Sequence, residues 1–219
     1  MLVIRVRIAV SSGRFMASRK FKIFIGILLT AFLIVTVLVY LFRNSETVHP
    51  AEEMTLPDNV VYYSQKNPEW AEDTLGTSAY QMSDSGCLVT CIACALNMQE
   101  IRKINPKELN QLLSANQGYD EEGNLQWNVL EKLTNTEISL ENEEIPELLR
   151  NHIYPAVRVR MHGAGSYHYV LIIGSDKKNY LCIDPLNQEN QPVSLSEYGN
   201  RIYAVRYLKK SVTNNRPPE

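Results

Sequence analysis

Cys87, His168 and Asp184 are the residues of this chain whose types and positions suggest chemistry. Cys87 directly precedes the apolar segment 88–98 (LVTCIACALNM), whose length and composition predict a buried helix. Backbone N–H groups at the start of a helix favour negative charge, and therefore the nucleophilic thiolate form of a cysteine. Cys87 is thus a candidate nucleophile if a base can reach it.

The base must come from the second half of the chain. His168 begins the apolar run HYVLIIG and Asp184 ends the run YLCID, and both runs are typical of strands. If residues 174–178 form a five-residue hairpin loop, His168 lies directly opposite Asp184, with their Cβ atoms about 5 Å apart. A register shift of two residues would leave them diagonal neighbours. We therefore expect Asp184 to orient the His168 ring while its other nitrogen faces Cys87.

A cysteine hydrolase also needs hydrogen-bond donors for the oxyanion of its tetrahedral intermediate. The backbone N–H of Cys87 is one candidate donor. A glutamine side chain upstream would provide a second, and both Gln65 and Gln81 stand in that part of the chain. Spacing alone leaves the choice between these two glutamines open.

Other reactive residue types have simpler explanations. Cys91 and Cys94 lie inside the apolar helix and Cys182 lies in an apolar strand, so we expect all three to pack in the core. His162, in the predicted loop HGAGS, is the alternative base, although a loop histidine is more often simply solvated. No Cys/His cluster has the spacing of a zinc site. The sequence predicts neither a metal nor a cofactor.

The surrounding pattern places helices first and strands afterwards. We expect a short strand at residues 59–64 and further strands beyond residue 154. The predicted helices cover residues 88–98, 106–116, 125–133 and 144–150. This order is typical of an α+β domain in which the leading helices pack on an antiparallel sheet.

An uncharged apolar run of twenty residues, 23–42, precedes the domain. At 1.5 Å per residue, a helix of this length covers the roughly 30 Å hydrocarbon core of a bilayer. Arg19, Lys20 and Lys22 stand immediately before it, whereas only Arg43 follows directly. This asymmetry predicts a single-pass anchor with a cytoplasmic N-terminus and an extracytoplasmic domain. A cleaved signal peptide fits less well, because its apolar stretch is shorter and small residues follow it.

These features divide the chain into five parts. We expect a basic cytoplasmic tail at 1–22, a transmembrane helix at 23–42, a linker at 43–58, one domain at 59–208 and a polar tail at 209–219. All 24 acidic residues lie after Arg43, together with 15 of the 22 basic ones, a difference of nine negative charges. Such a charge argues against nucleic acid as a partner. The oligomeric state stays open.

Four segments together resemble a known family. They are YYSQKNPEW (62–70), SGCLVTCIACALN (85–97), SYHYVLIIG (166–174) and IDPL (183–186). As an ordered set they are similar to the peptidase C39-like family of bacterial papain-fold cysteine peptidases, which includes the peptidase domains of bacteriocin exporters. The resemblance implies a papain-like fold with Cys87 as nucleophile, His168 as general base and acid, and Asp184 as the orienting residue.

The resemblance also bears on the glutamine. Exporter domains have a Ser-Gln pair shortly before the cysteine, and Ser64-Gln65 matches that pair with an insertion before the helix, which favours Gln65. Many members have Gly-Pro after the cysteine, where this chain has Leu88-Val89.

We therefore expect a membrane-anchored, extracytoplasmic cysteine peptidase or amidohydrolase that acts on a peptide or protein. The same residues would also permit acyl transfer to an amine. The alternative is a catalytically inactive papain-like domain that binds peptides or a partner protein at the cell surface.

Overall fold

The computed structural model describes residues 19–139 and 144–211 and divides the chain into two compact units, Met1–Arg43 and Asn44–Glu219. The first unit contains the helix α1, Arg19–Phe42. Its stretch Phe21–Tyr40 has a mean hydropathy of 2.8 and is long and apolar enough to cross a membrane. By the same criteria it also fits a signal sequence. The predicted basic tail up to residue 18 lies outside the described residues.

The second unit is built on antiparallel strands. Those described are β1 Glu46–Thr47, β2 Glu53–Met54, β3 Thr136–Ser139, β4 Ala156–Arg160, β5 Tyr167–Asp176, β6 Tyr180–Ile183, β7 Val193–Ser194, β8 Arg201–Ile202 and β9 Ala204–Lys210. The main sheet has the order β3-β9-β4-β5-β6-β7, with β2 added to β5, while β1 and β8 form a separate pair. Strands β4 and β5 are central and largely buried because apolar residues dominate them.

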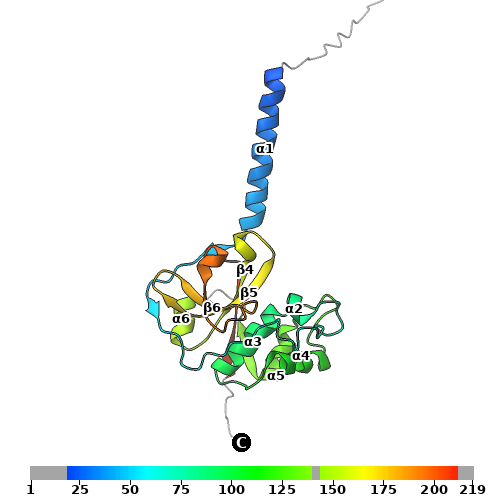
Figure 1. The fold of residues 1–219 in the computed structure, drawn as a ribbon, viewed down its shortest axis with the longest axis vertical. Helices are drawn as coiled ribbons and strands as arrows, with labels where there is room; N and C mark the ends of the chain where they lie inside the picture. The colour runs from blue at the N-terminus through cyan, green and yellow to red at the C-terminus, as the bar shows by residue number, and fades with distance from the viewer. Residues whose placement is uncertain (1–18, 140–143, 212–219) are drawn as a thin grey trace, which may run out of the picture. The chain divides into compact units, whose positions relative to one another are not determined.

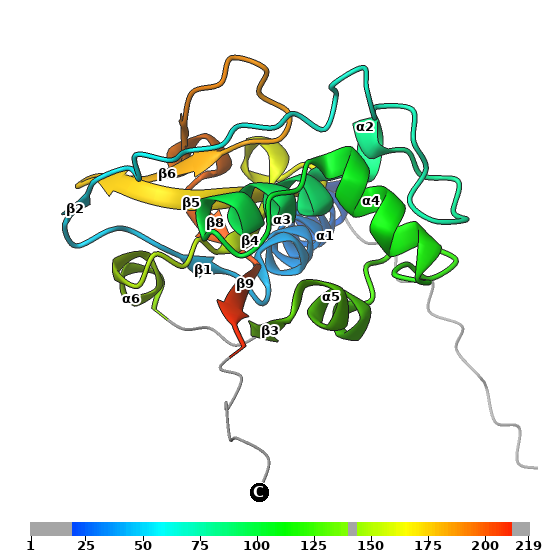
Figure 2. The ribbon, with the colours of Figure 1, turned by 90° about the horizontal axis from the view of Figure 1, so that it is seen from below.

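The second unit also contains helices. They are α2 Met82–Ser85, α3 Cys87–Met98, α4 Pro106–Ala115, α5 Trp127–Thr134 and α6 Ile145–Arg150, with 3-10 turns η1 Met161–Gly163 and η2 Leu195–Tyr198. Of these, α3 and α5 contact the strands directly. The apolar helix α3 packs on β5 and, on its other side, on α4 (Figures 1 and 2). The amphipathic α4 begins with a capping box between Asn105 and Glu108. The predicted α+β class, with helices packed on an antiparallel sheet and one apolar helix ahead of them, is confirmed.

The segment expected to be a linker, residues 43–58, is instead largely part of the domain. Residues 46–47 pair with β8 and residues 53–54 pair with β5. The hydroxyl of Ser175 also donates a hydrogen bond to the carbonyl of Glu52 over 2.7 Å. The backbone groups of these strand edges would otherwise need water, so pairing with this segment satisfies them.

Two other boundaries differ from expectation. Residues 59–64 do not form a strand, because they pair with no other strand. Their apolar side chains are partly buried and pack against the core. The Asn59 side chain donates to the Met98 carbonyl at the end of α3. At the other end, β9 continues to Lys210, into the expected polar tail, because it pairs with β3 up to that residue. Residues 212–219 of that tail lie outside the described residues.

The β5–β6 hairpin has a different register from the predicted one. Leu171 pairs with Ile183, two residues beyond the expected partner. The turn is tighter than a five-residue loop because the Asp176 carboxylate accepts hydrogen bonds from the backbone of Lys178 and Asn179. A bulge between Ile172 and Gly174 then shifts the pairing by one residue. With this register, His168 and Asp184 are diagonal rather than direct neighbours.

Candidate active site

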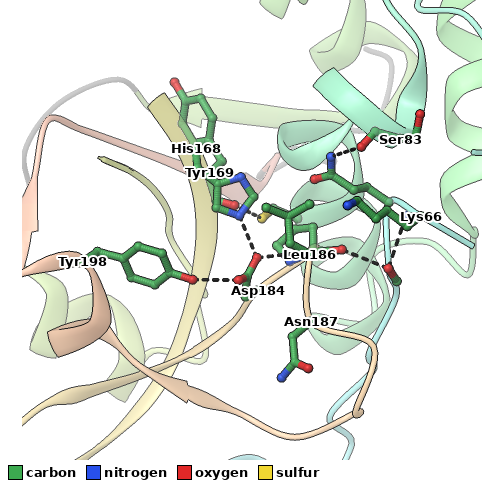
Figure 3. A network of polar contacts seen from close by, with 12 residues as sticks. Lys66, Ser83, His168, Tyr169, Asp184, Leu186, Asn187 and Tyr198 are labelled. Atoms are coloured by element: carbon green, nitrogen blue, oxygen red, sulfur yellow. Dashed lines mark hydrogen bonds and ion pairs between the residues drawn. The ribbon is translucent and has the colours of Figure 1, made fainter. Parts of the chain in front are cut away.

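His168 and Asp184 lie side by side despite the changed register. The His168 Nε2 atom is 2.6 Å from the Asp184 Oδ1 atom, and the two side chains are only 5% and 11% exposed (Figure 3). His168 is the second residue of β5, and Asp184 directly follows the end of β6. Because β6 has already ended there, the imidazole has room to reach the carboxylate past the end of the shorter strand.

Asp184 is fixed by two further donors. The Tyr198 hydroxyl donates to Oδ2 over 2.7 Å, and the backbone N–H of Leu186 donates to Oδ1 over 2.8 Å. Tyr198 ends the turn η2 and approaches the carboxylate from the side opposite to Leu186 (Figure 3). Sequence reasoning missed Tyr198, since a tyrosine in the polar stretch LSEYGN carries no periodic or motif signal.

Cys87 occupies the first position of α3, with Gly86 as the residue before the helix. It is half-buried and lies close enough to His168 to interact with the imidazole. A Cβ atom on Gly86 would lie 2.5 Å from the Met82 carbonyl oxygen, so the close packing of α2 against the start of α3 requires glycine there.

The electrostatics of the site favour an imidazolium. Burial opposes the charged form of His168, but the hydrogen bond to Asp184 and the interaction with Cys87, together with the charges of both groups, raise its pKa to about 9. Burial likewise opposes the charged form of Asp184, yet its bonds to His168, Tyr198 and Leu186 leave its pKa lowered. Burial and the neighbouring Asp184 raise the pKa of Tyr198, which keeps its hydroxyl a donor.

Gln65 is buried beside this group, at 1% exposure. Its backbone N–H donates to the Pro185 carbonyl over 2.9 Å, and its side-chain Nε2 donates to the Ser83 carbonyl over 2.7 Å. The Ser64 hydroxyl also donates to Pro185, so the segment carrying Gln65 is fastened directly behind Asp184. The Oε1 atom of Gln65 has no hydrogen-bond partner among the described residues.

The other candidates lie elsewhere. Gln81 precedes α2 and is exposed, and His162 is exposed in η1 with a positive φ of 51°. Trp70 is buried, and its Nε1 donates to the Ser64 carbonyl, which steadies the segment before Gln65. Within residues 19–139 and 144–211, no group of three or more His, Cys, Asp or Glu side chains is placed to hold a metal ion.

The remaining cysteines are buried thiols. Burial raises the pKa of Cys91 well above its ordinary value, raises that of Cys94 to about 12 and also raises that of Cys182. Cys87 is therefore the one cysteine of the four that is both partly accessible and close enough to His168 to interact with it. A thiol, an imidazole and a carboxylate in this order have the arrangement that nucleophilic acyl transfer needs.

Comparisons with known proteins add little to this geometry. No protein-family model matches the sequence, and no curated protein matches it significantly. Among solved structures, a Bacillus anthracis protein described as a candidate C39-like peptidase is similar, with 13% sequence identity and a TM-score of 0.49. The similarity covers 72% of this chain and 98% of the other. We draw no functional conclusion from it.

Proposed function

We propose that this chain is a membrane-anchored, extracytoplasmic cysteine peptidase or amidohydrolase of the C39-like, papain-fold type. The observation that carries the proposal is the His168 ring, which lies 2.6 Å from the largely buried Asp184 carboxylate and close enough to Cys87 to interact with it. Two hydrogen-bond donors besides the ring hold that carboxylate. A purely structural cysteine at a helix start has no need of this arrangement.

In the proposed reaction the Cys87 sulfur attacks the carbonyl carbon of an amide, while His168 holds the thiol proton. The tetrahedral oxyanion accepts hydrogen bonds from the Cys87 backbone N–H and from Gln65. An amide nitrogen has two hydrogens, so Gln65 keeps one donor beyond its bond to Ser83. The C–N bond then breaks as His168 protonates the leaving amine, and His168 next deprotonates the water that hydrolyses the thioester. Asp184 orients the ring throughout.

The location is part of the proposal. The run Phe21–Tyr40 is apolar enough to cross a membrane, and the basic residues before it favour a cytoplasmic N-terminus. The test is whether the chain stays with membranes after alkaline extraction and whether protease added to intact cells digests the domain. A mature N-terminus beyond residue 42 would instead identify the helix as a cleaved signal sequence.

The decisive test of function is alkylation of the full-length chain in detergent by iodoacetamide, read at each cysteine by mass spectrometry. We expect Cys87 to react at about pH 6 at least tenfold faster than a free thiol, and His168→Ala to remove that advantage. The buried Cys91, Cys94 and Cys182 serve as internal controls for unfolding. Equal rates for Cys87 in the wild type and in His168→Ala would refute the proposal.

One observation favours the alternative, a silent domain that binds peptides. The Gln65 amide already donates to Ser83, and its Oε1 atom is buried without a partner in the described part of the chain. If Cys87 proves no more reactive than a free thiol, the binding-module interpretation replaces the enzyme.

A further inference from the structure

Three arginines lie on one face of the sheet beside the candidate site. Arg158 and Arg160 are two residues apart in β4 and therefore point to the same face. Arg206 of β9 is paired with Ala156, two residues before Arg158, so it shares that face. We call Arg158, Arg160 and Arg206 the arginine cluster.

The positive charge of the arginine cluster is not compensated by the domain. Of the ion pairs in the described residues, none involves these three arginines. The Nε atom of each is buried and has no hydrogen-bond partner there. The hydrogen bonds that their guanidinium groups do make are to neutral oxygens: Arg160 donates to the Gly165 carbonyl and to the Tyr167 hydroxyl, and Arg206 donates to the Val205 carbonyl. This is unexpected in a domain with an excess of nine acidic residues.

Two members of the arginine cluster share one aromatic ring. The guanidinium carbons of Arg158 and Arg160 lie 4.5 Å and 4.2 Å from the centre of the Tyr167 ring. The ring attracts each cation, but two positive charges held at one ring also repel each other. A bound anion would relieve that repulsion. Tyr167 is 48% exposed, so such an anion has access from solvent.

The arginine cluster adjoins Cys87 through Tyr169. Arg158 is paired with Tyr169, and the Tyr169 phenol is close enough to Arg206, Arg158 and Cys87 to interact with their charges. The Cys91 sulfur, one helical turn after Cys87, lies 3.6 Å from the Tyr169 carbonyl oxygen. Tyr167 and Tyr169 flank His168 in β5, and their side chains point to the opposite face of the strand from the imidazole. A ligand held by the arginine cluster would therefore lie next to the candidate site.

We propose that the arginine cluster binds a carboxylate of the peptide substrate, either an acidic side chain or a C-terminal carboxylate, next to Cys87. The guanidinium fork matches a carboxylate in shape and charge. Because this inference rests on the proposed function, it selects among substrates for that same site: peptides with a suitably placed carboxylate bind, and neutral ones do not.

The first test compares two alkylating agents that differ in charge, iodoacetate and iodoacetamide, on the full-length chain in detergent. The measured quantity is the ratio of their rates at Cys87. We expect the double variant Arg158→Gln/Arg206→Gln to lower this ratio about fivefold while the iodoacetamide rate stays within about twofold. His168 is present in both proteins, so its own attraction for iodoacetate cancels.

Matched variants separate charge from packing. Arg158→Lys/Arg206→Lys retains both charges and should keep most of the ratio. Arg150→Gln makes the same chemical change at an exposed arginine that is paired with Glu52, and should leave the ratio unchanged. An unchanged ratio in Arg158→Gln/Arg206→Gln, with the iodoacetamide rate still high, overturns the carboxylate site but not the proposed function.

A second test does not need a reactive cysteine. Fluorescent peptides are titrated onto the Cys87→Ser chain: one has an internal Glu and an amidated C-terminus, another has Gln and a free C-terminus, and a third is neutral at both places. Tighter binding of the first or the second, lost in Arg158→Gln/Arg206→Gln, supports the proposal and identifies the source of the carboxylate. Equal affinity for all three peptides overturns it.

Discussion

Replacing Asp184 with asparagine should change how the stability of the domain depends on pH. The pKa of His168 is raised from 6.5 to about 9 in the folded protein. Below about pH 6.5 the ring is protonated in both the folded and the unfolded chain, so the stabilisation is fully present. As the pH rises towards 9, only the folded chain keeps the proton, and the stabilisation is progressively lost.

The size of this loss follows from the shift. Each pKa unit corresponds to about 1.4 kcal/mol, so the free energy of unfolding should fall by roughly 3 kcal/mol between about pH 6 and 9. His168 is only 4% exposed, so solvent screens this interaction little. In Asp184→Asn the main partner that raises the pKa of His168 is gone. Burial then keeps that pKa low, and the fall should shrink to about 1 kcal/mol or less.

The assay is urea unfolding of the full-length chain in detergent, followed by the fluorescence of Trp70 and Trp127, which both belong to the unit Asn44–Glu219. Groups that titrate identically in both proteins cancel in the difference between wild type and Asp184→Asn. That difference should be largest near pH 6 and smallest near pH 9. Parallel pH profiles for the two proteins, or a difference that grows with pH, would refute the reasoning.

Two further substitutions test the support around the site. Tyr198→Phe removes the donor to Asp184 and should lower the free energy of unfolding by about 1.5 kcal/mol in the same urea assay; no change would mean that the hydroxyl does not hold the carboxylate. Gly86→Ala places a methyl group against backbone and should cost about 1–3 kcal/mol and slow Cys87 alkylation. As its control, Asn105→Ala removes the α4 cap, so it should cost about 1 kcal/mol without slowing alkylation. Equal slowing in both would indicate a general loss of stability.

Part of the site can be predicted from the sequence because the apolar runs next to its residues are local features of the chain. The apolar run after Cys87 predicts a helix that starts there, and the runs next to His168 and Asp184 predict two neighbouring strands. The predicted hairpin register differs from the observed one by two residues. The turn depends on hydrogen bonds that the Asp176 side chain accepts, and no hydrophobic pattern predicts them. The two residues still meet because diagonal neighbours in a hairpin lie within reach of long side chains.

Other contacts have no sequence signature. Residues 46–47 and 53–54 join strand edges through backbone hydrogen bonds, which do not depend on side-chain type, so the sequence of this segment is typical of a linker. The hydrogen bond from Tyr198 to Asp184 joins residues 14 positions apart in the sequence, and the bond from Gln65 to Ser83 joins residues 18 positions apart. Their existence depends on tertiary packing, which composition and periodicity do not specify.

The bulge between Ile172 and Gly174 separates the hairpin into two parts with different registers. The pair Leu171–Ile183 lies on the His168 side of the bulge, and the pair Ser175–Tyr180 lies on the turn side. Changes in the length or composition of the turn can therefore be absorbed before they reach His168. Over evolutionary time the turn is free to diverge while the imidazole and carboxylate stay in place. For the same reason, the turn at Lys177 is a suitable position for inserting an epitope or a fluorescent reporter.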